Sequence, residues 1–434
     1  MRVKKIDFYN LLILSIMFDA YALFYIQNFP VTLFTIVSVL FIFRSLINGR
    51  IFKIAKVIQN YILLLLIGVL ILNYILNDFK YLTSFVQMLY FLILGLSAYR
   101  KEPLEKFNRY CNLFQKLMTY MSIYGIYQFI GRLFDFPFVD IVVPGHMVSG
   151  YNWTNSIYIL GHTVYRSNAI FREPSYFGQM LAISLILYVP EIISKDKKSI
   201  NIYVAIIIQA IAMIATISGT GIMMLGFSFI IYCLMTMKRK KFWRRIFPIA
   251  IVVSIIAVFA LLFTKFGNYF LMRAEELFVY NKDASSGFVR FRAWLLVVKE
   301  AWTTNWLFGS GIGSAVGYVQ RYAVQFFGMT LNGFAKVSTE LGFVGVFLWS
   351  AYILSFLQKK NNIELSSGYL MLTCSMIPLI FMHEASTSNI FWLFTSLLNC
   401  SLIDYPKCSC DKICEMKKMN LAVSMSNLSE GFKQ

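Results

Sequence analysis

The chain has 434 residues, of which 58% are hydrophobic, 17% are aromatic and only 14% are charged. Soluble domains carry roughly a quarter charged residues, so this composition excludes a water-soluble globule. The net charge of +19 comes from short basic clusters beside apolar runs, a pattern typical of membrane topology rather than of nucleic-acid binding. We therefore expect no nucleic-acid partner, and we expect anionic lipid headgroups beside the basic clusters.

The apolar runs predict an all-α polytopic membrane protein of about 12 transmembrane helices, because the runs are long and lack the alternation of a barrel strand. They lie near residues 8–27, 31–47, 57–77, 80–98, 112–131, 174–190, 201–217, 219–236, 246–264, 340–357, 367–383 and 389–403. The chain divides into 1–131, 132–173, 174–264, 265–339, 340–403 and 404–434. No small-residue cleavage site follows the first run, so we expect no cleavable signal peptide.

The distribution of Lys and Arg predicts the orientation. With the N-terminus inside, 27 of the 40 Lys and Arg are cytoplasmic, 12 are outside and Lys116 lies within a span. The opposite orientation would reverse this ratio and break the positive-inside rule. We therefore expect both termini in the cytoplasm.

Two predicted outward connections, 132–173 and 265–339, are long, and such loops often carry function. In the second loop, apolar residues recur at helical spacing from Phe288 to Trp302, which predicts an amphipathic helix along the membrane surface. All seven cysteines lie in predicted spans or on the inner side, which excludes an external disulfide framework. The last three are free thiols or metal ligands, in a spacing that fits no strong zinc pattern: Cys408, Cys410 and Cys414.

Arginine and histidine gather on the predicted outer side. The members are Arg132, Arg166, Arg172, Arg273, Arg290, Arg292 and Arg321, with His146, His162 and His383. Because a guanidinium fork matches phosphate oxygens, we expect an anionic ligand here, with a lipid-linked phosphate or pyrophosphate as the candidate. In the alternative interpretation the arginines meet headgroups or pair with carboxylates, namely Glu173, Glu275, Glu276 and Asp283.

The sharpest local feature is the stretch from Arg166 to Gly178, which contains Arg172-Glu173-Pro174. Proline suits the first turn of a helix, so the sixth span is predicted to begin there. Its N-terminus would face outward and present unpaired N–H groups beside Arg172, which favours an anion site. Glu173 is either the structural partner of Arg172 or a proton acceptor.

Three further features bear on chemistry. No Asp-x-Asp pair occurs to hold a divalent ion, so we expect a metal-independent mechanism without a cofactor. The glycines from Gly309 to Gly313 follow no strand and lack the P-loop lysine, which favours a tight turn over nucleotide binding. Asp19, inside the first predicted span, either lines a lipid or proton path or is a buried hydrogen-bond partner.

Several of these stretches together resemble a known family. Arg166 with Arg172-Glu173-Pro174-Ser175 resembles the R…F-x-E-P-S stretch of bacterial O-antigen and capsular polysaccharide polymerases of the Wzy type. Ser218–Gly221 is similar to the S-x-T-G turn of this family, and Ser286–Trp294 is similar to its S-x-x-x-R-x-x-x-W segment. Leu307–Gly313 resembles its (L/F)-G-x-G segment. Asn332 with Glu340–Gly342 resembles the H-N…E-x-G stretch that the family shares with O-antigen ligases. The ordered set covers about residues 165–345, and the N-terminal half contributes only matching topology.

The resemblance implies a glycosyltransferase of the bacterial cytoplasmic membrane that joins undecaprenyl-pyrophosphate-linked glycans at the outer face. A chain-length regulator and a flippase would be its partners. Leu331 stands where ligases carry histidine, which favours polymerisation over ligation. The implied catalytic residues are Arg172, Glu173, Arg290 and His162, and the implied substrate-binding residues are Arg166, Ser175, Arg292, Asn332 and Trp294. An O-antigen ligase and a polysaccharide flippase or transporter are the alternatives.

Overall fold

The computed structural model describes residues 7–26, 29–49, 58–148, 151, 156–159, 162–193, 200–236, 293–323, 331–357, 367–382 and 387–403. These residues are mostly helical. The helices are α1 Phe8–Ser15, the 3-10 turn η1 Ile16–Phe18, α2 Leu33–Ile47, α3 Ile58–Leu76, α4 Leu82–Ser97, α5 Leu104–Phe134, α6 Pro174–Ile193, α7 Ile200–Thr216, α8 Gly219–Thr236, α12 Ala293–Asn305, α13 Ser314–Ala323, α14 Gly333–Ser355, α15 Ser367–Met382 and α16 Asn389–Leu398.

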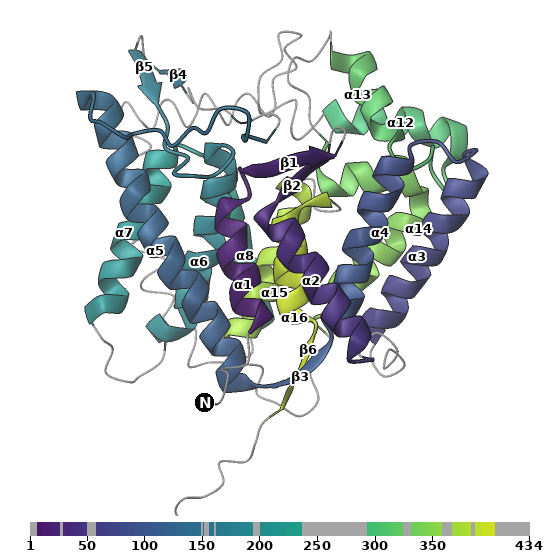
Figure 1. Cartoon of the computed structure of the whole chain (residues 1–434), viewed down its shortest axis with the longest axis horizontal. Helices are drawn as coiled ribbons and strands as arrows, with labels where there is room; N and C mark the ends of the chain where they lie inside the picture. The colour runs from purple at the N-terminus through teal and green to yellow at the C-terminus, as the bar shows by residue number, and fades with distance from the viewer. Residues whose placement is uncertain are drawn as a thin grey trace, which may run out of the picture.

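Six short strands form three two-stranded sheets within the described part of the chain. The strands are β1 Ala22–Ile26, β2 Phe29–Thr32, β3 Arg100–Pro103, β4 Ser156–Ile159, β5 His162–Tyr165 and β6 Cys400–Ile403. β1 pairs with β2 and β4 with β5, both antiparallel, whereas β3 and β6 are parallel, with Arg100 opposite Cys400. Figure 1 shows β1, β2, β4 and β5 with α12 and α13 at one end of the helices, and β3 with β6 at the opposite end. We call the first of these the β1 end.

Four described helices, α3, α6, α8 and α14, are long and apolar enough to cross a membrane, and shorter apolar helices accompany them. This supports the predicted helical membrane protein. The predicted span at 246–264 lies outside the described residues. In the second long connection, α12 overlaps the predicted amphipathic helix from Ala293 to Trp302: Ala293, Val297, Val298 and Ala301 are buried at helical spacing and pack against α13 and α14. The predicted start at 288–292 lies outside the described residues, and the position along a membrane surface stays a prediction.

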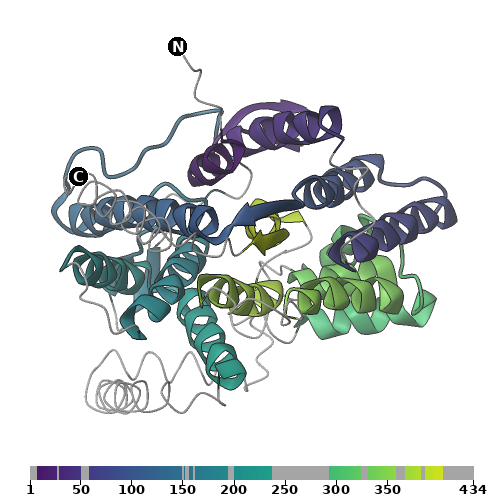
Figure 2. The ribbon, with the colours of Figure 1, turned by 90° about the horizontal axis from the view of Figure 1, so that it is seen from below.

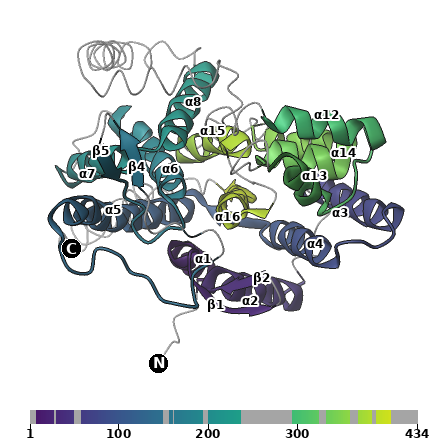
Figure 3. The same cartoon turned by 90° about the horizontal axis from the view of Figure 1, so that it is seen from above.

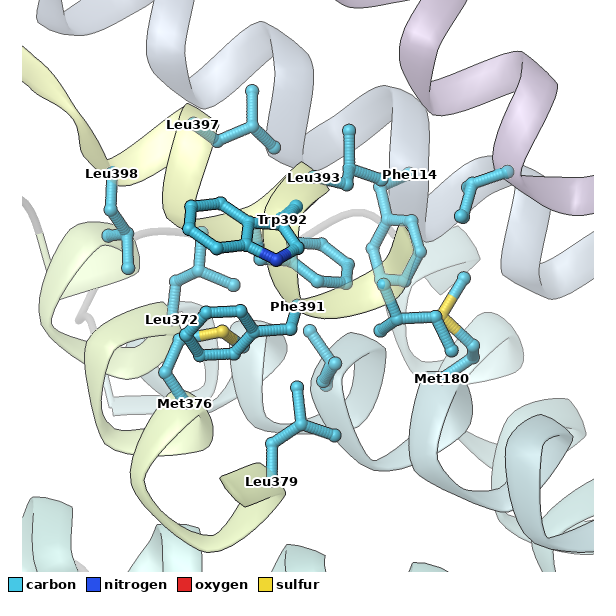
Figure 4. Packing of buried hydrophobic residues seen from close by; sticks show 14 of the residues in the cluster. Phe114, Met180, Leu372, Met376, Leu379, Phe391, Trp392, Leu393, Leu397 and Leu398 are labelled. Carbon is cyan, nitrogen blue, oxygen red and sulfur yellow. The ribbon is translucent and has the colours of Figure 1, made fainter. Parts of the chain in front are cut away.

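Helix α16 lies at the centre of the assembly, as the views from below and above show (Figures 2 and 3). Every side chain from Ile390 to Leu398 is buried. Trp392 stacks on Phe91 of α4 with ring centroids 5.9 Å apart and meets Trp349 of α14 edge-on at 5.6 Å. Figure 4 shows Trp392 and Phe391 of α16 packed among buried residues that include Leu372 and Met376 of α15. A Cβ on Gly95 would lie 2.8 Å from the Trp392 ring, so glycine is what lets this indole approach α4.

Three of the predicted helical spans contain strand residues. The first run, predicted to span 8–27, ends as a helix at Phe18, and the second run begins inside β2. Residues 22–26 and 29–32 pair as antiparallel strands of which the first is all apolar, and an apolar strand cannot be told from a helix by hydropathy. The last run, predicted to span 389–403, is helical only to Leu398 and ends in β6, because β3 offers its backbone for pairing there.

Two pairs of glycines bring helices into backbone contact. A Cβ on Gly221 would lie 2.7 Å from the carbonyl carbon of Gly178, so α8 crosses the first turns of α6 at van der Waals distance. Gly342 breaks α14 with φ 63° and ψ −158°, and the turn at Gly309 fills that break. Gly309, Gly311 and Gly313 all have positive φ, so the predicted tight turn is confirmed.

Candidate functional site

Helix α6 begins at Pro174, as predicted, with Arg172 and Glu173 just before it at the β1 end. The Glu173 carbonyl oxygen accepts the N–H groups of Tyr176 at 3.1 Å and Phe177 at 3.3 Å, which closes the first turn. Arg172 and Glu173 are partly exposed, whereas Ser175 is buried. The Arg172 guanidinium lies 5.8 Å from the ring centroid of Tyr176, within cation–π range.

A buried polar turn fixes the chain ahead of α6. Gln128 of α5 accepts hydrogen bonds through Oε1 from Ser167 Oγ at 3.1 Å and from the backbone N–H groups of Asn168 at 3.0 Å and Ala169 at 2.9 Å. Asn168 Nδ2 donates to the Phe171 carbonyl at 2.6 Å. Ala169 has φ 49°, a left-handed conformation that costs about 1–2 kcal/mol without glycine. The hydrogen bonds of Gln128 and Asn168 offset this cost and hold the backbone that leads to Arg172 in place.

Asp19 lies beside this helix start. It follows the last residue of η1, and its Oδ1 accepts a 2.5 Å hydrogen bond from Asn389 Nδ2 at the first residue of α16. Arg172 is close enough to act electrostatically on the Asp19 carboxylate, and so is Tyr90 of α4. Residues separated by up to 370 positions in sequence are therefore brought together around one carboxylate. The predicted hydrogen-bond role of Asp19 is confirmed; the predicted lipid or proton path stays a prediction.

Burial raises the pKa of Asp19 to about 6, against the lowering effects of the Asn389 hydrogen bond and of Arg172. Asp19 stands beyond the apolar helix Phe8–Phe18, and its side chain is partly exposed. A carboxyl group of this pKa is ionised at neutral pH and still has an appreciable affinity for a proton. It is thus suited to proton exchange near neutrality.

At the same place, the N-terminus of α16 has no side-chain cap. Ser388, the residue before the helix, is 5% exposed, makes no side-chain cap, and its Oγ has no hydrogen-bond partner among the described residues. Lys336 Nζ of α14 donates to Thr387 Oγ1 at 3.1 Å, which adds a positive charge near this helix start. Unpaired N–H groups at a helix N-terminus with a cation nearby favour an anion.

Several helices begin at the β1 end and run away from it, among them α6, α8, α14 and α16. From above, α6 and α14 lie on either side of α16 (Figure 3). Gln179 Nε2 of α6 approaches the Met382 carbonyl of α15 at 3.5 Å, so the start of α6 is joined to the chain that leads into α16. The partial positive charges of these N-termini add to those of Arg172 and Lys336.

Two of the outward arginines have structural partners instead. Arg132 forms a salt bridge with Asp140 and also donates to the Arg166 carbonyl, while its side chain is only 7% exposed. Arg321 forms a salt bridge with Glu300 on the surface of α12 and α13. These two follow the alternative interpretation of the arginine set, although their partners are not the carboxylates predicted from sequence. Arg166 itself is partly exposed at the start of the polar turn.

Other predicted site residues have structural contacts or lie outside the residues that the structure describes. Asn332 caps α14, with Oδ1 accepting from Ala335 N at 2.8 Å. The Trp294 ring meets Phe334 edge-on at 6.1 Å. His162 pairs through its backbone with Ile159 in the β4–β5 hairpin, and its side chain is outside the described part. Arg290 and Arg292 lie outside the described residues.

Sequence reasoning missed Gln128, Ser388, Asn389 and Lys336. Gln128, Ser388 and Asn389 are amides or hydroxyls in or beside apolar runs, where such residues are common, and Lys336 is one basic residue among many. Only Asp19 carried a signal, because a charge within a predicted span is costly and usually has a reason. Within the described part of the chain, no three His, Cys, Asp or Glu side chains gather in a way that would hold a metal ion.

Comparison with known proteins adds no assignment to this geometry. No protein-family model matches the chain, and no curated protein sequence matches it.

Proposed function

We propose that the chain is a metal-independent glycosyltransferase that joins undecaprenyl-pyrophosphate-linked repeat units into a surface polysaccharide. It would do so at the outer face of the bacterial cytoplasmic membrane, with twelve spans, both termini in the cytoplasm and the β1 end outward. The charge distribution of the sequence supports this orientation, because the segments predicted inside carry most of the Lys and Arg.

One observation carries the proposal: Arg172 and the open N-terminus of α16 converge on Asp19 at the β1 end. A pyrophosphate needs positive charge and N–H donors, and both are present here. A sugar hydroxyl that attacks an anomeric carbon must lose its proton, and a partly exposed carboxylate lies within the same group of residues. The order of motifs from Arg166 to Gly342 supports a polymerase of the Wzy type among enzymes of this chemistry.

In the proposed reaction the pyrophosphate departs from the anomeric carbon of the growing glycan, and Arg172 stabilises its developing charge. A guanidinium aimed at that charge lowers the barrier without a metal ion. Arg166 would hold this pyrophosphate together with Arg172, and Arg290 would hold the other pyrophosphate or the leaving group.

Reconstitution tests this function. The full-length protein is placed in lipid vesicles with a lipid-linked repeat unit as sole substrate, and the product is sized by electrophoresis. Chain growth without any other protein supports a polymerase. Transfer only to an added lipid A acceptor would identify a ligase, and movement of the lipid-linked unit across the bilayer without bond formation would identify a flippase. Either of these two results would overturn the proposal.

A further inference from the structure

Asp19 has a second carboxylate oxygen that the fold leaves available. Asn389 Nδ2 donates to Oδ1, whereas no described residue donates to Oδ2. Within the described part of the chain, Asp19 also forms no salt bridge, although Arg172 acts on it electrostatically. Oδ2 is therefore available to accept a proton or a further hydrogen bond.

The surroundings of Asp19 come from four separate elements. Asp19 stands at the end of η1, Arg172 at the start of α6, Asn389 at the start of α16 and Tyr90 on α4. Asn389 fixes the carboxylate by one oxygen, and the buried helix α16 fixes Asn389 in turn. A proton acceptor needs this kind of support, because its reach to the reacting hydroxyl must hold within a few tenths of an ångström.

We propose that Asp19 is the proton acceptor of the glycosyl transfer, positioned by Asn389 beside the pyrophosphate site of Arg172. This inference rests on the proposed function. The acceptor hydroxyl oxygen forms a bond to the anomeric carbon of the donor, and the bond from that carbon to the pyrophosphate oxygen breaks. The electron pair leaves with undecaprenyl pyrophosphate. The hydroxyl proton passes to Asp19 Oδ2 and is released to water when the product departs.

The first test is Asp19→Asn, which keeps the shape and the contact with Asn389 but cannot take up a proton. We expect kcat for chain extension to fall about 10²–10⁴-fold, with KM for the lipid-linked unit little changed. The matched control is Asp78→Asn, an exposed carboxylate between α3 and α4 whose only described ion-pair partner is Lys80. This control should retain the wild-type kcat.

The second test needs no loss of the carboxylate. Rate against pH for the wild type should rise about tenfold per unit at low pH and level off above about 6, the pKa of Asp19. Because the Asn389 hydrogen bond lowers the pKa of Asp19, Asn389→Ala should move the midpoint to higher pH. His146, whose Nδ1 is 3.0 Å from the Ala22 carbonyl, is a titratable group nearby, and His146→Gln should leave the midpoint unchanged.

The outcomes separate the two proposals. If the wild type extends chains but Asp19→Asn keeps kcat within about threefold, or if the midpoint follows His146 and not Asn389, Asp19 is not the acceptor and the polymerase function stands. A large loss in Glu173→Gln with Asp19→Asn unaffected would likewise overturn the assignment in favour of Glu173. If the wild type extends no chains, the proposed function itself fails. Should Asp19→Asn not accumulate, the shift in Asn389→Ala decides the question.

Discussion

Gly309 and Gly342 meet backbone to backbone: a Cβ on either one would come within 2.5 Å of the backbone nitrogen of the other. The contact joins the turn after α12 to the break in α14. Ser310 N donates to the Thr339 carbonyl at 2.9 Å, and Phe343 N donates to the Trp306 carbonyl at 2.9 Å. The turn therefore supplies hydrogen bonds on both sides of the break, which makes an interrupted helix tolerable within a membrane protein.

Gly342→Ala should destabilise the protein. The added Cβ overlaps the backbone of Gly309, which cannot swing aside as a side chain would, and φ of 63° is unfavourable for alanine. Overpacking costs about 1–3 kcal/mol, and the backbone conformation of φ 63° and ψ −158°, which is occupied essentially by glycine, costs about 1–3 kcal/mol more for alanine. Thermal unfolding in detergent should show a lower Tm. Gly226→Ala in α8, where a Cβ meets nothing within 4 Å, is the control, and an equal loss there would contradict this account.

Asn73→Ala in α3 should weaken the contact between the turn after α12 and the break in α14. The buried Asn73 Nδ2 donates to the carbonyls of Phe308 at 2.6 Å and Glu340 at 3.0 Å, and Oδ1 accepts from Ile312 N at 3.1 Å. Each buried group left without a partner costs about 1–3 kcal/mol. Proteolysis of the folded protein should become faster around the α12–α14 connection. Asn48→Ala, at an exposed helix end, should have little effect; similar sensitivity in both variants would argue against the bridge.

Gln128→Ala should lower activity through Arg172 rather than through substrate contact. Without Oε1, the N–H group of Asn168 loses this acceptor and that of Ala169 keeps only the 3.4 Å contact with Ser167 Oγ, so the left-handed Ala169 loses most of its support. We expect kcat to fall by an order of magnitude or more, because small displacements of a positioned group cost up to about 10²-fold. The surface variant Gln320→Ala on α13 is the control. Unchanged kcat with a lowered Tm would restrict Gln128 to a structural role.

Local chemistry made part of this structure predictable. Pro174 suits the first turn of a helix, so the start of α6 was predicted correctly. Apolar spacing predicted α12, and the three glycines after Phe308 predicted a turn. In each case the signal lies within one element, where the identity of a residue acts directly on its own backbone.

Long-range pairing made the rest unpredictable. Asp19 meets Asn389 across 370 positions, and β3 pairs with β6 across 300. Nothing local distinguishes the apolar run from Ala22 to Ile26 from a helix, since its hairpin partner decides its conformation. Sequence reasoning also placed Arg132 among the outward arginines expected to bind an anion, because its ion pair with Asp140 depends on the fold of the first long loop.

Arg172→Ala should abolish long products while leaving the fold intact. Removing a hydrogen-bond donor aimed at developing charge lowers the rate about 10²–10³-fold. The fold should persist because Arg172 is partly exposed just before the start of α6 and is not part of the hydrophobic core. Arg172→Lys should rescue only in part, because an ammonium cannot form a bidentate contact with phosphate oxygens. Arg321→Ala removes another arginine at the β1 end whose salt bridge is on the surface, and it should cost no more than about 1 kcal/mol of stability.

The most direct measurement is the initial rate of chain extension in vesicles that contain the lipid-linked repeat unit and equal amounts of wild-type, Arg172→Ala or Arg321→Ala protein. We predict chain growth by the wild type, growth within about twofold of it by Arg321→Ala, and a rate at least a hundredfold lower for Arg172→Ala. Equal rates for the wild type and Arg172→Ala, or no extension by the wild type, would contradict the proposal that the site around Arg172 joins lipid-linked glycans.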